Sequence, residues 1–422
     1  MAATVDFGGA AIEGGDMADE QQDIARRLRE LRAWRRKTLK VIAELAGITE
    51  GHLSRLERGK RRLDKRSTIA ALAAALQVSP SELIGQPVCW EDPAMAEAQA
   101  TIPALRLALA GTELGQSGTG SARPVGDLVT EVDRCVALRT ACDFAAMGAM
   151  LPSLLADLYT TVTIVRGEER AVMLRQLIRA LNSAMTLAHA FGYVDLAYLV
   201  TERSAQTAAD LREPAWAAVA AFSRVHALLP MGAHDQAYTF ASRATDAARS
   251  VTGEVSANPA LASYGALCTV SALVAAVTGR TDESDARLAE AAVLAQRTGE
   301  TGPDVACFGP TNVAMYRMTS ALERGDSALA VELAGSVQPA HIASPERRAK
   351  HWLDTGRALA ALRGREHDAV AAFQCSETLA ALRLRSNFYA RESVAGLLPQ
   401  VRRDTAAGRE LHGIAYRMGL PA

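Results

Sequence analysis

A short element that recurs five times constrains the fold of this chain most. It consists of a glycine, an Asp-like position three residues later and a small residue two positions further on, and successive glycines are 40, 47, 46 and 39 residues apart. Glycine suits the turn between two helices, and a small residue lets the two helices pack closely. The sequence therefore predicts a row of helical hairpins, with a non-repetitive helix bundle as the alternative. The copies are Gly192/Asp195/Ala197, Gly232/Asp235/Ala237, Gly279/Asp282/Ser284, Gly325/Ala328/Ala330 and Gly364/Asp368/Ala369, where the acid is displaced by one position.

The composition points to the same fold class. The chain contains 84 alanines in 422 residues, and aromatic residues make up only 5%. Alanine is the strongest helix former, whereas strands favour β-branched and aromatic residues, so we expect an all-α protein. No apolar run of about 18 residues is present and the six cysteines form no CxxC pair, which favours a cytoplasmic protein with reduced thiols and no membrane span.

Charge is distributed unevenly along the chain. Residues 19–66 contain 15 basic and 8 acidic residues, a balance of +7, and the remainder contains 31 basic and 39 acidic residues, a balance of −8. A basic segment on an acidic chain is typical of a module that binds a polyanion, although an ordinary solvated helix face gives a similar count. The pattern within the segment has to separate these interpretations.

That segment shows the periodicity of five short helices. Apolar residues repeat at helical spacing from Gln21 to about Arg36, and Thr38 and Thr49 are good N-caps for the next two helices. Gly47 and Gly59 end those helices, a fourth runs from about Lys65 to Leu76, and Ser79-Pro80 begins a fifth. The spacing of Ala43, Gly47 and Leu53 fits the tight crossing of a helix-turn-helix.

The stretch IAELAGITEGHLSRLERGKR (42–61), followed by ALAAALQVSPSELI (71–84), resembles the XRE, or phage-repressor-like, helix-turn-helix domains. The resemblance implies that the helix opening at Thr49 lies in the DNA major groove, where Glu50, Gly51, His52 and Arg55 occupy the base-reading positions. It further implies that Arg32 and Glu57 form a buried ion pair. Candidates for phosphate contacts are Arg36, Lys37, Thr38, Leu39, Lys40, Arg58, Lys60, Arg61 and Arg62.

Two positions depart from the family pattern. Gly51 has no side chain, so one usual reader of bases is missing, and Leu39 stands where the family often has glutamine. Both departures put part of the expected readout in doubt.

We expect four regions along the chain. Residues 1–18 form a disordered tail, 19–86 the DNA-binding domain, 87–124 one connecting helix and a linker, and 125–422 the helical repeats. From Gly111 to Ser121, eight of eleven residues are Gly, Ser or Thr, as in flexible linkers.

The repeat region resembles tetratricopeptide repeats, although its period exceeds the usual 34 residues. A repressor-like head on such a solenoid looks like the RRNPP-type regulators and similar actinobacterial proteins, in which the solenoid binds a signalling peptide and controls a DNA-binding dimer. That resemblance implies a homodimer, a near-palindromic operator, and a peptide or small-molecule effector. The candidate ligand-binding residues are the polar and aromatic positions Asn182, Ser223, His226, Tyr264, Asn312, Tyr316, Arg317, Trp352 and Asn387. For Asn312, capping of its helix is the alternative role.

The chain carries no GxSxG, HExxH, GxGxxG or Walker pattern, so we expect no catalytic residues, no metal site and no cofactor. The sequence thus predicts an all-α transcriptional regulator: a five-helix helix-turn-helix domain followed by an α-solenoid. The alternative is a protein-interaction adaptor, in which the solenoid recruits a partner and the head binds DNA weakly or without sequence preference.

Overall fold

The computed structural model describes residues 20–86, 92–112, 123–252, 259–302, 307–342 and 344–420, and within these ranges it contains helices and no strand. The predicted all-α class is confirmed. The expected tail at 1–18 and nearly all of the Gly/Ser-rich linker lie outside the described residues.

The five helices of the head follow the predicted capping signals. The side chains of Thr38, Thr49 and Ser79 each accept a hydrogen bond from a backbone N–H in the first turn of the following helix. Gly47 and Gly59 both have φ +64°, the left-handed conformation that a helix end requires. The helices are α1 (Glu20–Trp34), α2 (Leu39–Leu45), α3 (Glu50–Glu57), α4 (Arg66–Leu76) and α5 (Pro80–Ile84).

The connecting segment differs from the prediction of a single helix. It forms two helices, α6 (Pro93–Gln99) and α7 (Ile102–Gly111), separated by a turn at Ala100–Thr101, where the hydroxyl of Thr101 donates to the carbonyl of Ala98 at 2.7 Å. Met95 and Leu105 are fully buried in the same apolar core as α9 (Phe144–Ile164). The segment therefore packs onto the helices of residues 123–420, which form the body of the protein. It does not span a gap between two domains.

The body consists of paired helices, and the recurring element marks five of the turns between them. Its glycines have φ between +76° and +87°, and every one of its small residues, from Ala197 to Ala369, is fully buried against the partner helix. The predicted hairpins are therefore confirmed as α10–α11, α12–α13, α14–α15, α16–α17 and α18–α19. Their bounds are α10 (Gly167–Ala190), α11 (Val194–Leu211), α12 (Pro214–Leu228), α13 (His234–Thr252), α14 (Pro259–Val277), α15 (Thr281–Thr298), α16 (Pro310–Arg324), α17 (Ser327–Ser336), α18 (Pro345–Ala360) and α19 (Glu366–Ser386).

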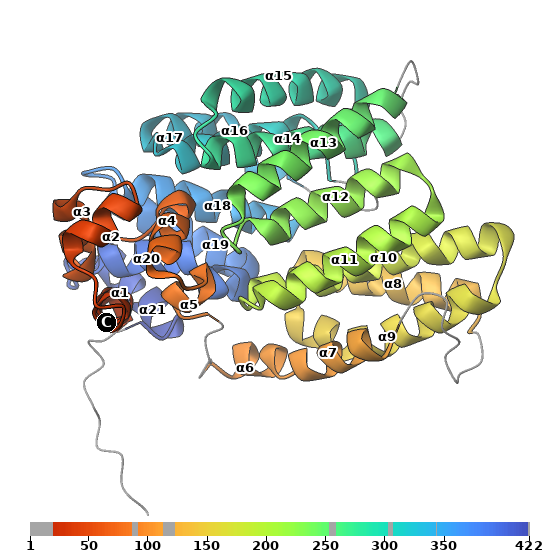
Figure 1. The fold of residues 1–422 in the computed structure, drawn as a ribbon, viewed down its shortest axis with the longest axis horizontal. Coiled ribbons are helices and arrows are strands. Elements are labelled where there is room, and N and C mark those ends of the chain that lie inside the picture. The colour runs from red at the N-terminus through yellow and green to blue at the C-terminus, as the bar shows by residue number, and fades with distance from the viewer. Residues whose placement is uncertain are drawn as a thin grey trace, which may run out of the picture.

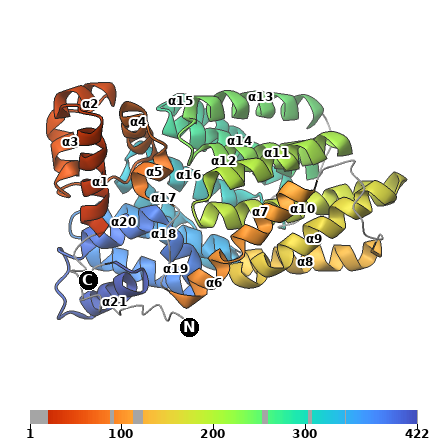
Figure 2. The same cartoon turned by 60° about the horizontal axis from the view of Figure 1, so that its bottom comes forward.

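The row of pairs returns to its own beginning (Figures 1 and 2). Helix α18 packs against α8 (Val125–Ala141), and Arg385 of α19 forms an ion pair of 3.1 Å with Asp92, just before α6. The chain then ends in α20 (Phe388–Leu397) and α21 (Ala406–Arg417). The C-terminal helices thereby lie between the beginning of the body and the head.

Two helices, α9 and α14, are long and apolar enough to cross a membrane by length and composition alone. Residues Leu261 to Val277 of α14 are all buried by neighbouring helices, and α9 packs against α6, α7, α8 and α10. Packing within the protein buries 94% of the apolar stretch of α14 and 50% of that of α9.

The head sits directly on the body, beside α18, α20 and the turns of the repeats (Figure 2). Phe388 at the start of α20 joins the apolar cluster of the head, which includes Leu28, Ile42 and Leu53. The position of the head is therefore set by contacts with the repeats.

Candidate nucleic-acid interface and ligand-binding residues

The helix-turn-helix is built from α2, the turn at Gly47 and α3. The amide of Ile48 donates to the carbonyl of Ala43 at 3.0 Å, which closes the turn after α2. Ile42 and Leu53 are completely buried between the two helices. This packing fixes the angle of α3 and leaves its other face to solvent.

The exposed face of α3 carries the predicted base-reading residues. Glu50, Gly51 and Arg55 are exposed, and His52 is half-buried beside them. Burial lowers the pKa of His52, and the nearby Arg61 and Arg55 lower it further. The imidazole is therefore neutral near pH 7, so it offers one donor and one acceptor to a base edge.

Most of the phosphate candidates are exposed to solvent. The exposed members are Arg36, Lys37, Thr38, Lys40, Arg58, Lys60 and Arg61, and Arg58 also donates to the carbonyl of Ser54 at 3.0 Å. Leu39 is half-buried and packs against the apolar cluster of the head, so its side chain contributes to folding.

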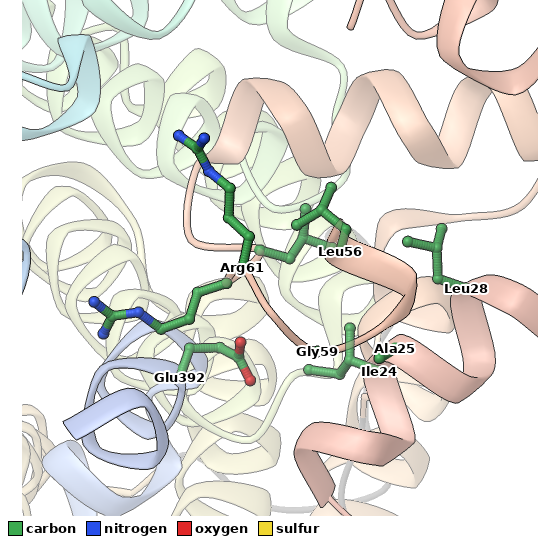
Figure 3. A pocket seen from close by; sticks show the side chains of 9 residues that line it. Ile24, Ala25, Leu28, Leu56, Gly59, Arg61 and Glu392 are labelled. Carbon is green, nitrogen blue, oxygen red and sulfur yellow. The ribbon is translucent and has the colours of Figure 1, made fainter. Parts of the chain in front are cut away.

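Arg62 corrects the sequence-based expectation. Its guanidinium donates to the carbonyls of Ser393 at 3.2 Å and Ala360 at 3.0 Å, both in the body. The head is docked through this side chain, which is consequently unavailable to a phosphate in this arrangement. Figure 3 shows Arg61 and Glu392 beside a small cavity at this boundary, lined also by Ile24, Leu28 and Leu56.

The expected ion pair between Arg32 and Glu57 is present. The guanidinium donates to both carboxylate oxygens, at 2.6 and 2.8 Å, and Glu57 is only 4% exposed. The pair ties the C-terminal end of α1 to the end of α3. It supports the fold of α3 and lies away from the exposed face of that helix.

Two pairs of the candidate ligand-binding residues come together in the body. Ser223 of α12 donates to the side-chain oxygen of Asn182 of α10 at 2.7 Å, and His226 lies 3.0 Å from the hydroxyl of Tyr316 on α16. Burial lowers the pKa of His226 to about 3, and the positive charges of Lys350, Arg66 and Arg383 contribute. His226 is therefore a neutral hydrogen-bonding group.

Other candidates have structural roles that their sequence pattern did not reveal. Tyr264 is buried and its hydroxyl bonds to Glu290 and Arg249 on the outer helices. Asn387 caps α20 by accepting from the amide of Ala390 at 3.0 Å. Both residues therefore have a structural role within the protein.

Asn312 and Trp352 also have protein partners. Asn312 is buried and accepts a hydrogen bond from Arg347. It does not cap α16, whose N-cap residue is Gly309. Trp352 packs against His351 with ring centres 5.4 Å apart, and Arg317 is exposed.

Sequence reasoning missed several charged residues near the pair of His226 and Tyr316. Lys350 of α18, Arg383 of α19 and His189 of α10 all act electrostatically on His226. Lys350 pairs with Asp354, and Arg383 with Glu346 at 2.8 Å. Their spacing within each helix resembles that of ordinary surface charges, so the sequence pattern did not indicate that they lie near His226. Among the described residues, no cluster of His, Cys, Asp and Glu has the arrangement of a metal site.

Comparisons with known proteins agree with the geometry of the head. Residues 23–83 match the family model of a helix-turn-helix domain, and no curated protein matches the chain. Among solved structures, the chain is similar to PlcR of Bacillus thuringiensis, crystallised in complex with the peptide PapR7 and DNA. The sequence identity is 13% and the TM-score 0.25, over 65% of this chain and 94% of that chain, a likeness too low to carry an argument about the body. Residues 23–83 of this all-α chain are thus a phage-repressor-like helix-turn-helix domain.

Proposed function

We propose that the protein is a sequence-specific transcriptional regulator, in which the helical-repeat body binds a regulatory ligand or partner and controls operator binding by the head. The observation that carries the proposal is the solvent-facing surface of α3 within a helix-turn-helix domain, with Glu50, His52 and Arg55 on it. In such domains an arginine on this helix pairs with guanine, and a glutamate accepts from cytosine. We expect the protein to act in the cytoplasm and without catalysis.

A single head offers few base contacts, because Gly51 contributes no side chain. Two heads on neighbouring half-sites supply the missing affinity, so we infer a homodimer that binds a near-palindromic operator. We further infer that the effector is a short peptide or a small molecule that contacts the body beside Asn182, His226 and Tyr316. An effector acts only through a difference in affinity between two arrangements of the heads.

The decisive experiment is to incubate the full-length protein with sheared genomic DNA at physiological salt and to sequence the retained fragments. A regulator retains a small set of fragments that share an inverted repeat, and Arg55→Ala changes the preference at one base of that repeat. The proposal would fail if the retained fragments shared no motif and their retention fell steeply as salt rose. The basic head would then bind DNA only through its phosphates.

The adaptor remains the second candidate, and two features of the head favour it. Gly51 removes one base reader, and Arg62 is held by the body instead of facing DNA. An adaptor would show no positional effect of Arg55→Ala and would instead retain a partner protein through the body.

A further inference from the structure

A buried cluster of charges crosses the boundary between the head and the body. Arg66, the first residue of α4, pairs with Glu323 near the end of α16, whose side chain is only 2% exposed. The same guanidinium lies over the ring of Tyr389 on α20, 4.7 Å from the ring centre. One side chain of the DNA-binding head thus reaches into the body.

The rest of the cluster belongs to the body. Arg357 of α18 lies 3.6 Å from Glu323 and 3.2 Å from Asp354, and it covers Tyr389 from a centroid distance of 4.7 Å. Lys350 pairs with Asp354, which also accepts from the hydroxyl of Thr319 at 3.0 Å. Tyr389 is therefore in contact with one arginine from the head and another from the body.

The charges of the body balance without the head. Lys350 and Arg357 match Glu323 and Asp354, so the cluster is neutral when Arg66 is absent and carries one excess positive charge when Arg66 enters. The excess charge offsets part of the attraction between Arg66 and Glu323, but that attraction still outweighs the desolvation of the guanidinium and raises its pKa, while the body stays neutral without Arg66. The body can therefore persist while the head is released, as a reversible contact requires.

The cluster reaches the region of the candidate ligand-binding residues at its other end. Lys350 is the most exposed member, with 32% of its side chain accessible. The positive charges of both Lys350 and Arg66 lower the pKa of His226 and of His189. The charge cluster therefore acts electrostatically on these two histidines.

We propose that Arg66 is a latch that holds the DNA-binding head in one orientation on the body, and that Glu323, Tyr389 and Arg357 form its receptor. Arg62 supports the docked position through its two bonds to backbone carbonyls of the body. Opening the latch frees the head while leaving the repeats folded. The further step, that the latch sets operator binding, rests on the proposed function.

The first test measures amide hydrogen exchange of the full-length protein and two variants, Glu323→Gln and Arg66→Gln. Because a hydrogen bond to a charged group is lost, we expect exchange at 62–76 and 388–397 to rise about tenfold in both variants. Arg66→Gln alters the cluster from the head side, so it covers the case in which Glu323→Gln disturbs folding of α16. Unchanged exchange in the head, or an equal rise throughout α16 to α19, would overturn the latch.

A matched control replaces a carboxylate of similar burial that does not touch the head. Glu377 of α19 is 8% exposed and pairs with Arg417 at 2.5 Å and Arg385 at 2.9 Å. Glu377→Gln should raise exchange in α19 and α21 and leave 62–76 unchanged. A rise at 62–76 in this control would mean that any loss of a buried charge loosens the head, and the assignment to Arg66 would fall.

The second test uses the operator and separates the latch from the proposed function. With the half-sites moved apart by about five base pairs, half a helical turn, a fixed pair of heads can no longer reach both sites. We expect the wild-type protein to lose at least tenfold in affinity and Glu323→Gln to lose much less. If hydrogen exchange reports the latch but Glu323→Gln retains the wild-type spacing preference, the role of the latch in operator binding is refuted while the latch itself stands.

Discussion

The backbone of Gly232 lies so close to Pro80 that a Cβ atom added at Gly232 would be 2.8 Å from Cγ of the proline ring. Gly232 forms the turn between α12 and α13, and Pro80 is the first residue of α5 in the head. Gly232→Ala should therefore push the head from the body, because the methyl group has no space there. We expect faster amide exchange in α4 and α5, together with the cost of placing alanine at φ +76°.

Gly279 provides a control for the backbone cost. It occupies the equivalent turn before α15 with φ +77°, and a Cβ added there meets nothing within 4 Å. Gly279→Ala should lower thermal stability by the strain of about 1–2 kcal/mol alone and leave exchange in the head unchanged. Equal exchange of the head in the two variants would contradict the close docking at Pro80.

Arg55 is the residue of α3 best suited to read a base, because it is exposed on the face opposite the buried Leu53 and Leu56. Arg55→Ala should weaken binding to the preferred operator by about 1–3 kcal/mol and relax specificity at one base position. Lys60→Ala should instead weaken binding equally on all sequences and reduce the salt dependence by about one ion. Titrations of operator variants at two salt concentrations check both results; a uniform loss for Arg55→Ala would make it a phosphate contact.

The pair of Arg32 and Glu57 should matter for folding of the head. Glu57→Ala removes the carboxylate partner of Arg32, whose part-buried guanidinium keeps only its bond to the carbonyl of Lys37, and should cost about 1–3 kcal/mol. The free energy of opening of α1 and α3, from hydrogen exchange, measures this loss. Glu30→Ala removes an exposed carboxylate 3.8 Å from Arg26 and should cost less than about 0.5 kcal/mol. Similar losses of stability in Glu57→Ala and Glu30→Ala would show that burial does not strengthen the contribution of Glu57.

Local sequence signals predicted the head and the hairpin turns well. Thr38, Thr49 and Ser79 cap their helices through contacts with residues three positions away, and a contact of that kind is visible in the sequence. The glycines of the recurring element are equally local, since each one satisfies the backbone of its own turn. Sequence patterns therefore predict contacts between residues that are close together in the chain.

Long-range contacts account for what the sequence did not predict. Arg62 looked like a phosphate ligand because it follows a basic run, yet its partners Ser393 and Ala360 are about 300 positions away in the chain. Tyr264 and Asn387 were predicted to contact a ligand because polar side chains on the first helix of each pair are candidates. In the structure, Tyr264 bonds to Arg249 of the neighbouring helix, and Asn387 caps its own helix. The pattern of residues within one helix does not show which distant residues its side chains will contact.

Glu392 gives the head–body contact a dependence on pH. Burial raises the pKa of its carboxyl to about 7 from an ordinary 4.5, against the effect of Arg62 and Arg391, and Asp64 raises it further. Between about pH 4.5 and 7, Glu392 of the body therefore holds a proton in the docked state and loses it when the head is released. Docking should be strongest at low pH and weaken as pH rises through this window, with no further change above it.

Protection factors at 62–76, corrected for intrinsic exchange, should thus fall several-fold between pH 5 and pH 7.5 in the wild-type protein. Glu392→Gln mimics the protonated carboxyl, so its protection factors should be high and nearly independent of pH. His52 works in the opposite direction, because a lowered pKa costs stability as pH falls below its ordinary 6.5. A wild-type protein whose head loosens toward acid pH, or a Glu392→Gln variant with the wild-type slope, would remove Glu392 from control of docking.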